Sequence, residues 1–396
     1  MPYIDGVDAR QIVMEGSVTH QHNRPSFARV RMPSDVAFGS ETSRLKVVTN
    51  GTLDFHGACV HIEDDGDEDE IYTTMTFADP TLLFEMRPVR DGVGSGDVGD
   101  FSKPSVIGRR KYGPQILEEV LTQSLDDSDP ADGEGPMGIA LGTFATGGAD
   151  LSGAPADWPM TIAELVALLA DTGELDVVNT PVDGGATMGV VSAYNGDWGS
   201  DLTGSVQFRY ATGSTSNVRR CRRTIDLADM CNKLWLYLGP RVGTKADPPG
   251  DQHWDANVTG TDPLLPDPPQ STILSAVAAS RSSFFTRMQI RIFDGDGVAD
   301  MLPLYRRWWQ METWMRCRPK TMVHVTPDRG IAPAFRTGDL ISVQAGSRFR
   351  GGFSGAQRVM EYTYRWDNDG VLELGEPIGV PNAPAVVASY QADGLS

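Results

Sequence analysis

Two of the six histidines, His20 and His22, lie two residues apart in a β-rich run. Alternate residues of a strand share a face, so this pair could supply two ligands to a metal ion. The spacing assigns no third ligand, and histidines at an exposed strand end are also compatible with an ordinary sheet surface. The sequence therefore favours no metal site at this pair.

Two acidic segments have the composition of calcium-binding loops. Residues 63–70 read EDDGDEDE, and residues 294–300 begin with DGDG. A calcium loop needs a glycine at its sharp turn and a bidentate Glu at its end. In the second segment Ala299 and Tyr305 stand at these two positions, so a turn with Asp300 as a helix N-cap accounts for it better. In the first segment no Glu completes the ligand set, and we expect a solvated hairpin tip.

Two short patterns typical of catalysis or nucleotide binding stand in the wrong context. Ser43 and Lys46 match SxxK, but on a strand they would face opposite sides and could not form a nucleophile–base pair. Residues 94–99 match GxGxxG, but prolines flank them where a dinucleotide fingerprint requires a strand and a helix. No GxSxG, HExxH or P-loop occurs. Carboxylate pairs for glycoside hydrolysis stay open, because such a pair is defined only in three dimensions.

The tryptophans and cysteines also do not predict a binding or catalytic site. Trp308, Trp309 and Trp314 could form a sugar platform, but tryptophans at this spacing beside methionines more often form a core or an oligomer face. The cysteines show no CxxC spacing and are expected to be buried thiols of a protein made in a reducing cytosol. They are Cys59, Cys221, Cys231 and Cys317. The sequence thus assigns no catalytic, cofactor-binding or metal-binding residue, and we expect no cofactor and no enzymatic activity.

Length and charge limit the class of protein. The chain has 396 residues and a formal net charge of −19, with 53 acidic against 34 basic residues. This length predicts two or three domains with a core that needs no disulfide or metal. The acidic charge argues against binding to nucleic acid or to an anionic membrane surface. The N-terminus lacks the pattern of a signal peptide and no apolar run approaches the ~20 residues of a membrane span, so we expect a soluble protein.

The elements that would position a site begin with a β-rich part, residues 1–90. Short β-prone runs separated by turn residues predict a small barrel or sandwich. The last two runs flank the acidic segment and predict a hairpin. The runs are 11–20, 26–32, 44–49, 58–62 and 71–77. Residues 91–113 follow as a Gly-rich linker.

The middle part, residues 114–242, combines helices and strands. Apolar residues at helical spacing predict a helix from Pro114. Thr161 and Glu164 form a capping box for a second helix that ends at Gly173. The remaining predictions are strands at 175–179, 188–194 and 205–210, and a helix at 226–233 that leads into a buried strand at 234–238. This mixture predicts an α/β domain.

A Pro-rich loop at 243–270 precedes the last part, residues 271–380. This part is predicted to contain a strand–helix–strand unit and a C-terminal β-barrel domain, and residues 381–396 form a peripheral tail. The predicted elements are a strand at 287–293, a helix at 300–318, and strands at 322–325, 340–344, 358–366 and 371–374.

The order of these parts resembles the tail-hub, or minor tail protein, family of long-tailed (siphovirus-type) bacteriophages, which is related to baseplate hub proteins and to the spike proteins of type VI secretion. The resemblance rests on the opening ARQIVMEGSVTHQHNRPSFARVRMP and on FRTGDLISV and YTYRWDNDGVLELG near the C-terminus. It covers most of residues 1–380. It implies an α+β, β-rich fold in which two small β-barrel or sandwich domains flank an inserted α/β domain.

The same resemblance implies a structural role at the tip of a phage tail. Such hubs form trimeric rings that join the tail tube to the tip and let DNA pass. The implied partners are other copies of the chain, a distal tail or tail-tube protein, the tape-measure protein and tail-tip or fibre proteins, without sequence-specific nucleic-acid binding or membrane insertion. The implied location is the virion, after synthesis in the host cytoplasm. An acidic ring would repel the phosphates of passing DNA.

Two other functions are compatible with the sequence. A receptor- or carbohydrate-binding tail protein would use the tryptophans of the 300–318 helix, and it predicts glycan affinity that Trp308→Ala removes. A tail-associated cell-wall hydrolase would use a carboxylate pair, and it predicts lytic activity that one carboxylate change abolishes. The hub is the preferred interpretation because the order of the parts supports it.

Overall fold

The structure of the chain is a computed structural model. The described residues are 2–9, 13–35, 39–49, 51–66, 71–89, 112–125, 137–148, 151, 160–171, 173, 175–211, 216–228, 230–238, 253–255, 270–293, 316–327, 335–346, 352–366 and 378–379. Within these ranges no helix has the length and apolar character needed to cross a membrane.

The first sheet has eight strands in the order β19-β3-β4-β7-β6-β5-β1-β2, and all neighbouring strands are antiparallel. Seven of these strands come from the N-terminal part, which is β-rich as the sequence predicts. The strands are β1 (Pro2–Ile4), β2 (Val7–Asp8), β3 (Glu15–Gln21), β4 (Phe27–Pro33), β5 (Arg44–Thr49), β6 (Thr52–Gly66), β7 (Ile71–Ala78) and β19 (Glu361–Trp366).

Two hairpins hold the register of this sheet. Between β5 and β6, Gly51 has a φ of 81°, a left-handed conformation that glycine adopts without strain. Strands β6 and β7 pair from Ala58 opposite Ala78 to Gly66 opposite Ile71, which confirms the predicted hairpin around the acidic run. Residues 67–70, at the tip of that run, lie outside the described residues.

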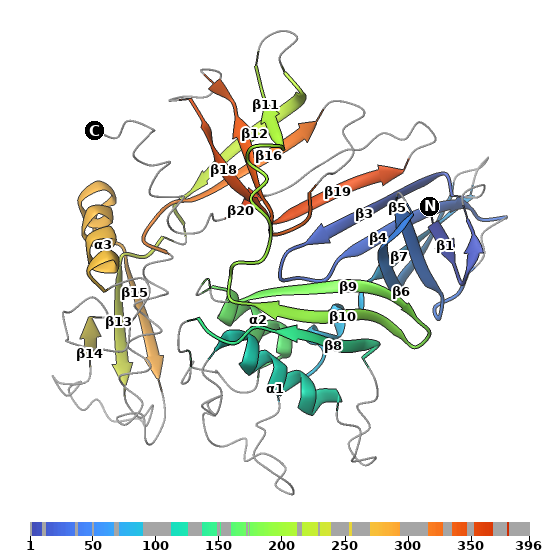
Figure 1. Ribbon diagram of the computed structural model, residues 1–396, viewed down its shortest axis with the longest axis horizontal. Helices are drawn as coiled ribbons and strands as arrows, with labels where there is room; N and C mark the ends of the chain where they lie inside the picture. Colours follow the sequence, from blue (N-terminus) through green and yellow to red (C-terminus); the bar gives the residue numbers. More distant parts are fainter. Residues whose placement is uncertain are drawn as a thin grey trace, which may run out of the picture.

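The middle part contains a three-stranded sheet with two helices on one side of it (Figure 1). Its order is β8-β10-β9, with β8 parallel to β10. The predicted capping box is confirmed, because Thr161 Oγ1 accepts from Glu164 N at 3.2 Å and Glu164 Oε2 accepts from Thr161 N at 2.7 Å. The elements are η1 (Pro80–Glu85), α1 (Gly113–Leu125), β8 (Ile139–Phe144), α2 (Ile162–Ala170), β9 (Asp176–Gly184) and β10 (Thr187–Tyr194).

A six-stranded sheet combines strands from the middle and the end of the sequence. Its order is β11-β17-β18-β20-β16-β12. The strands are β11 (Gln207–Arg209), β12 (Val218–Asp226), β16 (Lys320–Pro327), β17 (Leu340–Gln344), β18 (Ser354–Val359) and β20 (Ile378–Gly379). β11 runs parallel to β17 and β12 runs antiparallel to β16, so long-range pairing holds both strands.

The chain changes sheets at Met360. β18 belongs to the six-stranded sheet, whereas β19 pairs with β3 of the first sheet and lies beside it (Figure 1). Val359 is buried in the one sheet, and Tyr362 and Tyr364 are buried in the other. Because the residues before Met360 pair with β17 and those after it pair with β3, the single strand predicted over residues 358–366 is divided in two.

A small sheet of order β14-β13-β15 completes the described elements. Its strands are β13 (Lys233–Leu238), β14 (His253–Asp255) and β15 (Met288–Phe293), and α3 (Gln270–Phe284) precedes β15. The helix predicted at 226–233 is wrong, because β12 continues to Asp226 and β13 begins at Lys233. Between them Cys231 N donates to Arg316 O, so pairing with distant segments overrides the local helical preference.

Two apolar cores lie within these layers. One packs α1 and α2 against β8, β9 and β10, with Leu117 and Leu165 fully buried. The other is shared by the first and the six-stranded sheets, where Phe77 belongs to the same cluster as Val323 and Ile341. The predicted β-rich α+β fold is therefore confirmed. None of the sheets formed by the described residues closes into a barrel.

Candidate functional site

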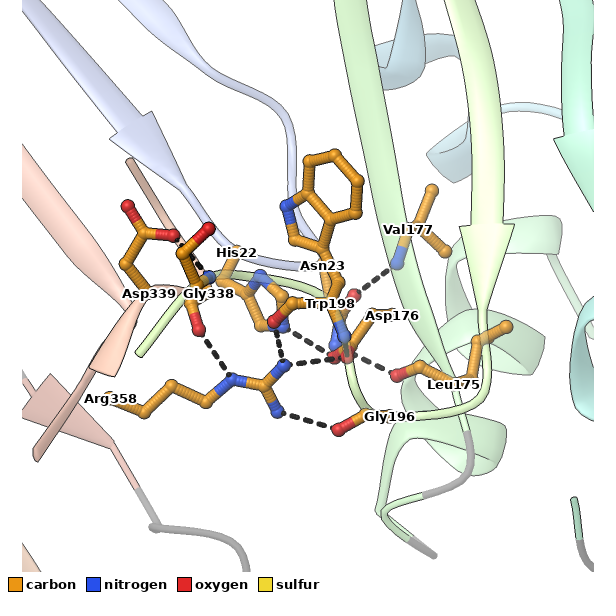
Figure 2. Close-up of polar contacts among 11 residues, drawn as sticks. His22, Asn23, Leu175, Asp176, Val177, Gly196, Trp198, Gly338, Asp339 and Arg358 are labelled. Carbon is orange, nitrogen blue, oxygen red and sulfur yellow. Dashed lines mark hydrogen bonds and ion pairs between the residues drawn. The ribbon is translucent and has the colours of Figure 1, made fainter. Parts of the chain in front are cut away.

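A buried cluster of polar side chains lies where the first, the middle and the six-stranded sheets meet. We call it the polar junction, and its members are His22, Asn23, Asp176, Asp339 and Arg358 (Figure 2). At its centre, Asp176 Oδ1 lies 2.6 Å from His22 Nε2, and Asp176 Oδ2 lies 2.6 Å from Arg358 Nη2. His22 follows β3, Asp176 begins β9 and Arg358 lies in β18, so one carboxylate links all three sheets.

Arg358 is 7% exposed and donates to three carbonyl oxygens as well as to Asp176. Its Nε donates to Gly338 O at 3.1 Å, and its Nη1 and Nη2 donate to Gly196 O at 3.2 Å and Trp198 O at 2.6 Å. The planar fork of a guanidinium suits such multiple acceptors, and charge-assisted bonds of this kind are strong. Arg358 therefore fixes the loops after β10 and before β17.

Asn23 and Asp339 bind backbone groups at the edges of the junction. Asn23 has a φ of 57°, its Oδ1 accepts from Val177 N at 2.6 Å, and its Nδ2 donates to Leu175 O at 3.3 Å. Asp339 accepts from Ser200 N and from Arg336 N, each at 2.7 Å. Asparagine tolerates the left-handed region better than most residues, so the turn before β4 can present its amide to β9.

Burial acts to raise the pKa of the Asp176 carboxyl. The hydrogen bond and charge of His22, the charge of Arg358 and the N–H of Trp198, which donates to Oδ2 at 2.9 Å, act in the opposite direction and outweigh it. The pKa of Asp176 therefore lies below its ordinary value of 3.8. The junction holds this carboxylate ionised, with cationic or donor groups on both oxygens.

This arrangement suits fixation of the sheets better than catalysis. A histidine beside a carboxylate is part of a nucleophilic triad, but a triad also requires a hydroxyl or thiol on the other nitrogen of the histidine. No hydrogen bond from His22 to a serine, threonine or cysteine is present in the described part of the chain. Both oxygens of Asp176 already accept hydrogen bonds from donors, so neither is available to take a proton from a substrate as a general base would.

A cleft of about 620 Å³ opens beside the junction. Tyr194 and Trp198 stack there with their ring centroids 4.5 Å apart, and Phe335 and Arg336 also line it. Asp339 contributes to the wall, but its two oxygens already accept backbone N–H groups.

His20 lies in a second polar cluster, apart from that of His22. His20 Nε2 is 3.3 Å from Asp54 Oδ2, which also accepts a hydrogen bond from the hydroxyl of Tyr364. Burial, followed by the charge of Asp54, raises the pKa of Tyr364, so the phenol stays protonated and donates. The His20 ring lies 4.8 Å from that of Tyr362. The cluster therefore links β19 to β3 and β6 within the first sheet.

The two histidines considered as metal ligands bind different carboxylates, Asp54 and Asp176. Among the described residues no group of three His, Cys, Asp or Glu side chains is arranged to hold a metal ion.

Ser43 and Lys46, which match SxxK, do not form a nucleophile–base pair. Ser43 Oγ donates to Asp5 at 2.7 Å, and Lys46 Nζ lies 2.5 Å from Asp183.

None of the four cysteines, all of which lie in the described part of the chain, forms a disulfide bond. Cys231 and Cys317 are buried as predicted, whereas Cys59 and Cys221 are partly exposed. The segment 94–99, the segment 294–300 and the tryptophans at 308, 309 and 314 lie outside the described residues, as do the strand predicted at 371–374 and nearly all of the helix predicted at 300–318.

Sequence reasoning did not identify the residues at the centre of the junction. Asp176 and Arg358 were predicted only to lie in strands, and no role was predicted for their side chains. The available signal was a charged residue at the start of an apolar run, in LDVVN for Asp176 and in RVMEYTY for Arg358. A charge in such a position requires a partner when it is buried, but the partner's identity depends on the fold.

Comparison by sequence gives no relatives: no protein-family description matches the chain. No curated protein matches it either.

Comparison by structure gives similar folds among tail proteins. The 43 kDa tail protein of prophage MuSo2 from Shewanella oneidensis superposes with a TM-score of 0.54 at 13% identity, covering 93% of this chain and 96% of that one. The tail protein from Neisseria meningitidis MC58 superposes with a TM-score of 0.54 at 9% identity, covering 96% and 95%. The predicted resemblance to tail proteins is therefore confirmed at the level of the fold, over almost the whole length of both chains.

Proposed function

We propose that this chain is a structural tail protein: a hub whose copies form a homotrimeric ring that joins the tail tube to the tip and lets DNA pass. The observation that carries the proposal is the shared fold with two tail proteins, which extends over at least 93% of this chain. The polar junction supports a structural role, since it is built from saturated ion pairs and hydrogen bonds that fix three sheets together.

The proposed partners follow from this role. They are two further copies of the chain, a distal tail or tail-tube protein, the tape-measure protein and tail-tip or fibre proteins. The proposed location is the tip of the virion tail, after synthesis in the host cytoplasm. No catalysis, no sequence-specific nucleic-acid binding and no membrane insertion by this chain is part of the proposal.

The division of the chain is proposed as follows. Residues 1–90 and 271–380 carry the two β domains and residues 114–242 the inserted α/β domain, joined by the 91–113 linker and the 243–270 loop, with 381–396 as a tail. Strands β12 and β19 cross the boundaries of this division, because each pairs with a strand of another part. Such exchanges support a hub in which the parts move as one body.

The proposal is tested by mass and by location. Native mass spectrometry of the purified full chain is expected to give a trimer, and antibody-labelled particles are expected to show the label at the tail tip by electron microscopy. A preimmune serum on the same particles is the control for labelling. A chain that remains a monomer at high concentration and is absent from purified tails would overturn the proposal.

A further inference from the structure

Strand β12 (Val218–Asp226) carries four arginines at the edge of the six-stranded sheet. It reads VRRCRRTID, and in the described structure it pairs with β16 on one side and with no strand on the other. An edge strand presents a row of backbone N–H and C=O groups that can pair with a further strand. The position is thus suited to strand addition by another chain.

The register separates the two faces of β12. Cys221 and Arg223 lie opposite the buried residues Val325 and Val323, which makes theirs the core face. Arg223 is held there, because its Nη1 donates to Gly352 O at 3.0 Å. Arg220 and Arg222 alternate with them and are exposed on the outer face.

The outer face of β12 presents two exposed arginines on a protein whose net charge is negative. No carboxylate lies within ion-pair distance of Arg220 or Arg222 in the described part of the chain. Burial, followed by the charge of Arg222, lowers the pKa of His324 on the neighbouring strand, against an opposing effect of Glu361. A net charge of −19 means that another copy of this chain is itself rich in complementary charge. The occupant of this edge should therefore be acidic.

A matching edge occurs on β6. Its pairing with β5 ends at Ala58 opposite Arg44, but its pairing with β7 continues to Gly66, so Val60–Gly66 has an outer edge with no strand partner in the described structure. Glu63 and Asp65 lie on one face of this segment and are exposed. The nearest cation that pairs with Glu63 is the exposed Arg29, at 4.0 Å.

We propose that the β12 edge of one copy receives the β6 edge, residues 60–66, of a second copy, with Arg220 and Arg222 facing Glu63 and Asp65. The two arginines and the two carboxylates are each two positions apart, about 6.6 Å along a strand, so both ion pairs form in one register. The two edges are different surfaces, which makes the contact heterologous and able to close into a ring. The inference thus rests on the proposed ring-forming function and names the surfaces that would form the ring.

Charge exchange in the full chain tests this contact. Both R220E/R222E and E63R/D65R are expected to raise the dissociation constant of the oligomer about 100-fold, because each reversed pair turns attraction into repulsion. The variant that combines all four changes is expected to regain the oligomer. R24E/R209E, which alters two exposed arginines outside both edges by the same charge, is the matched control and should assemble like the wild type. Sedimentation velocity measures assembly, and circular dichroism confirms that each variant is folded.

The outcomes separate the inference from the proposed function. An oligomeric wild type whose R220E/R222E variant still assembles would overturn the inference and leave the ring intact. Dissociation of both double variants without recovery in the combined variant would also overturn it, since the edges would then not face each other. An R220E/R222E oligomer that no longer enters tails would assign the arginine edge to another tail protein instead. A monomeric wild type would count against the ring itself.

Discussion

The guanidinium of Arg358 and the carboxylate of Asp176 form a buried ion pair between residues 182 positions apart, with Nη2 2.6 Å from Oδ2. Arg358 stands two residues before the chain leaves the six-stranded sheet, and Asp176 is the first residue of β9. His22 occupies the other oxygen of Asp176 and adds the first sheet. A contact among three sheets at one carboxylate restricts their relative motion.

Asp176→Asn is expected to lower the free energy of unfolding by about 3 kcal/mol at neutral pH. The amide has nearly the same shape as the carboxylate but leaves Arg358 buried without a counter-charge, which is the costly way to break such a pair. Urea denaturation followed by circular dichroism measures the change. Asp197→Asn, at an exposed position of the neighbouring loop, is the control and should change the value by less than about 0.5 kcal/mol.

Replacing both partners distinguishes a stabilising pair from one that chiefly fixes geometry. We expect Asp176→Leu with Arg358→Met to lose less free energy of unfolding than the sum of Asp176→Leu and Arg358→Met measured alone, because neither charge then remains buried without its partner. A double variant that loses as much as the sum of the single changes would argue against this account.

Stability is expected to fall as the pH decreases through about 6.5, because of His56. Burial lowers the pKa of this imidazole, against the opposing hydrogen bond from its Nδ1 to Val182 O at 2.7 Å, and the charge of Lys46 lowers it further. Below about pH 6.5 the unfolded chain therefore binds a proton that the folded chain does not, which favours unfolding until the folded pKa is also passed. Free energies of unfolding between about pH 5 and 8 should show a slope that His56→Gln reduces.

Local signals allowed part of this fold to be predicted. The capping box of Thr161 and Glu164 and the β6–β7 hairpin depend on residues close in sequence, and both are present. The helix expected at 226–233 and the single strand expected at 358–366 failed because pairing with distant strands decides those segments. α3 gave no signal, since its small and polar residues form no apolar stripe.

The polar junction could not be predicted for a related reason. The local signal at Asp176, a charge at the start of an apolar run, is shared by solvated residues at strand starts. The burial of Asp176, and its partners on β18 and after β3, exist only once three sheets have assembled. The two histidines two positions apart were a visible pattern, but the structure uses each of them with a different carboxylate.

Asn23 combines a backbone role and a side-chain role that two substitutions separate. Asn23→Gly preserves the left-handed backbone but removes the hydrogen bonds to Val177 N and Leu175 O, and is expected to lower the free energy of unfolding by about 1–2 kcal/mol. Asn23→Ala also strains the backbone and should lose about 1 kcal/mol more. Chemical denaturation of both variants measures the order. Equal losses would mean that the backbone conformation contributes nothing.

Gly338→Ala is expected to disrupt the junction from its backbone side. Gly338 has a φ of 93°, and a Cβ there would lie 2.6 Å from Trp198 Cδ1 and 3.1 Å from Trp198 O. Trp198 would have to move, although its N–H and carbonyl hold Asp176 and Arg358. We expect a loss of about 2–4 kcal/mol, from backbone strain together with the lost hydrogen bonds.

Gly346→Ala is the matched control for this substitution. Gly346 also has a positive φ, 51°, but no atom lies within 4 Å of the position that an alanine methyl group would take there, so only backbone strain of about 1 kcal/mol is expected. The difference in the free energy of unfolding between the two variants therefore measures the cost of displacing Trp198, including the hydrogen bonds that Trp198 makes with Asp176 and Arg358. If both glycines tolerate alanine equally well, the loop that contains Trp198 is free to adjust, and the junction does not depend on its position.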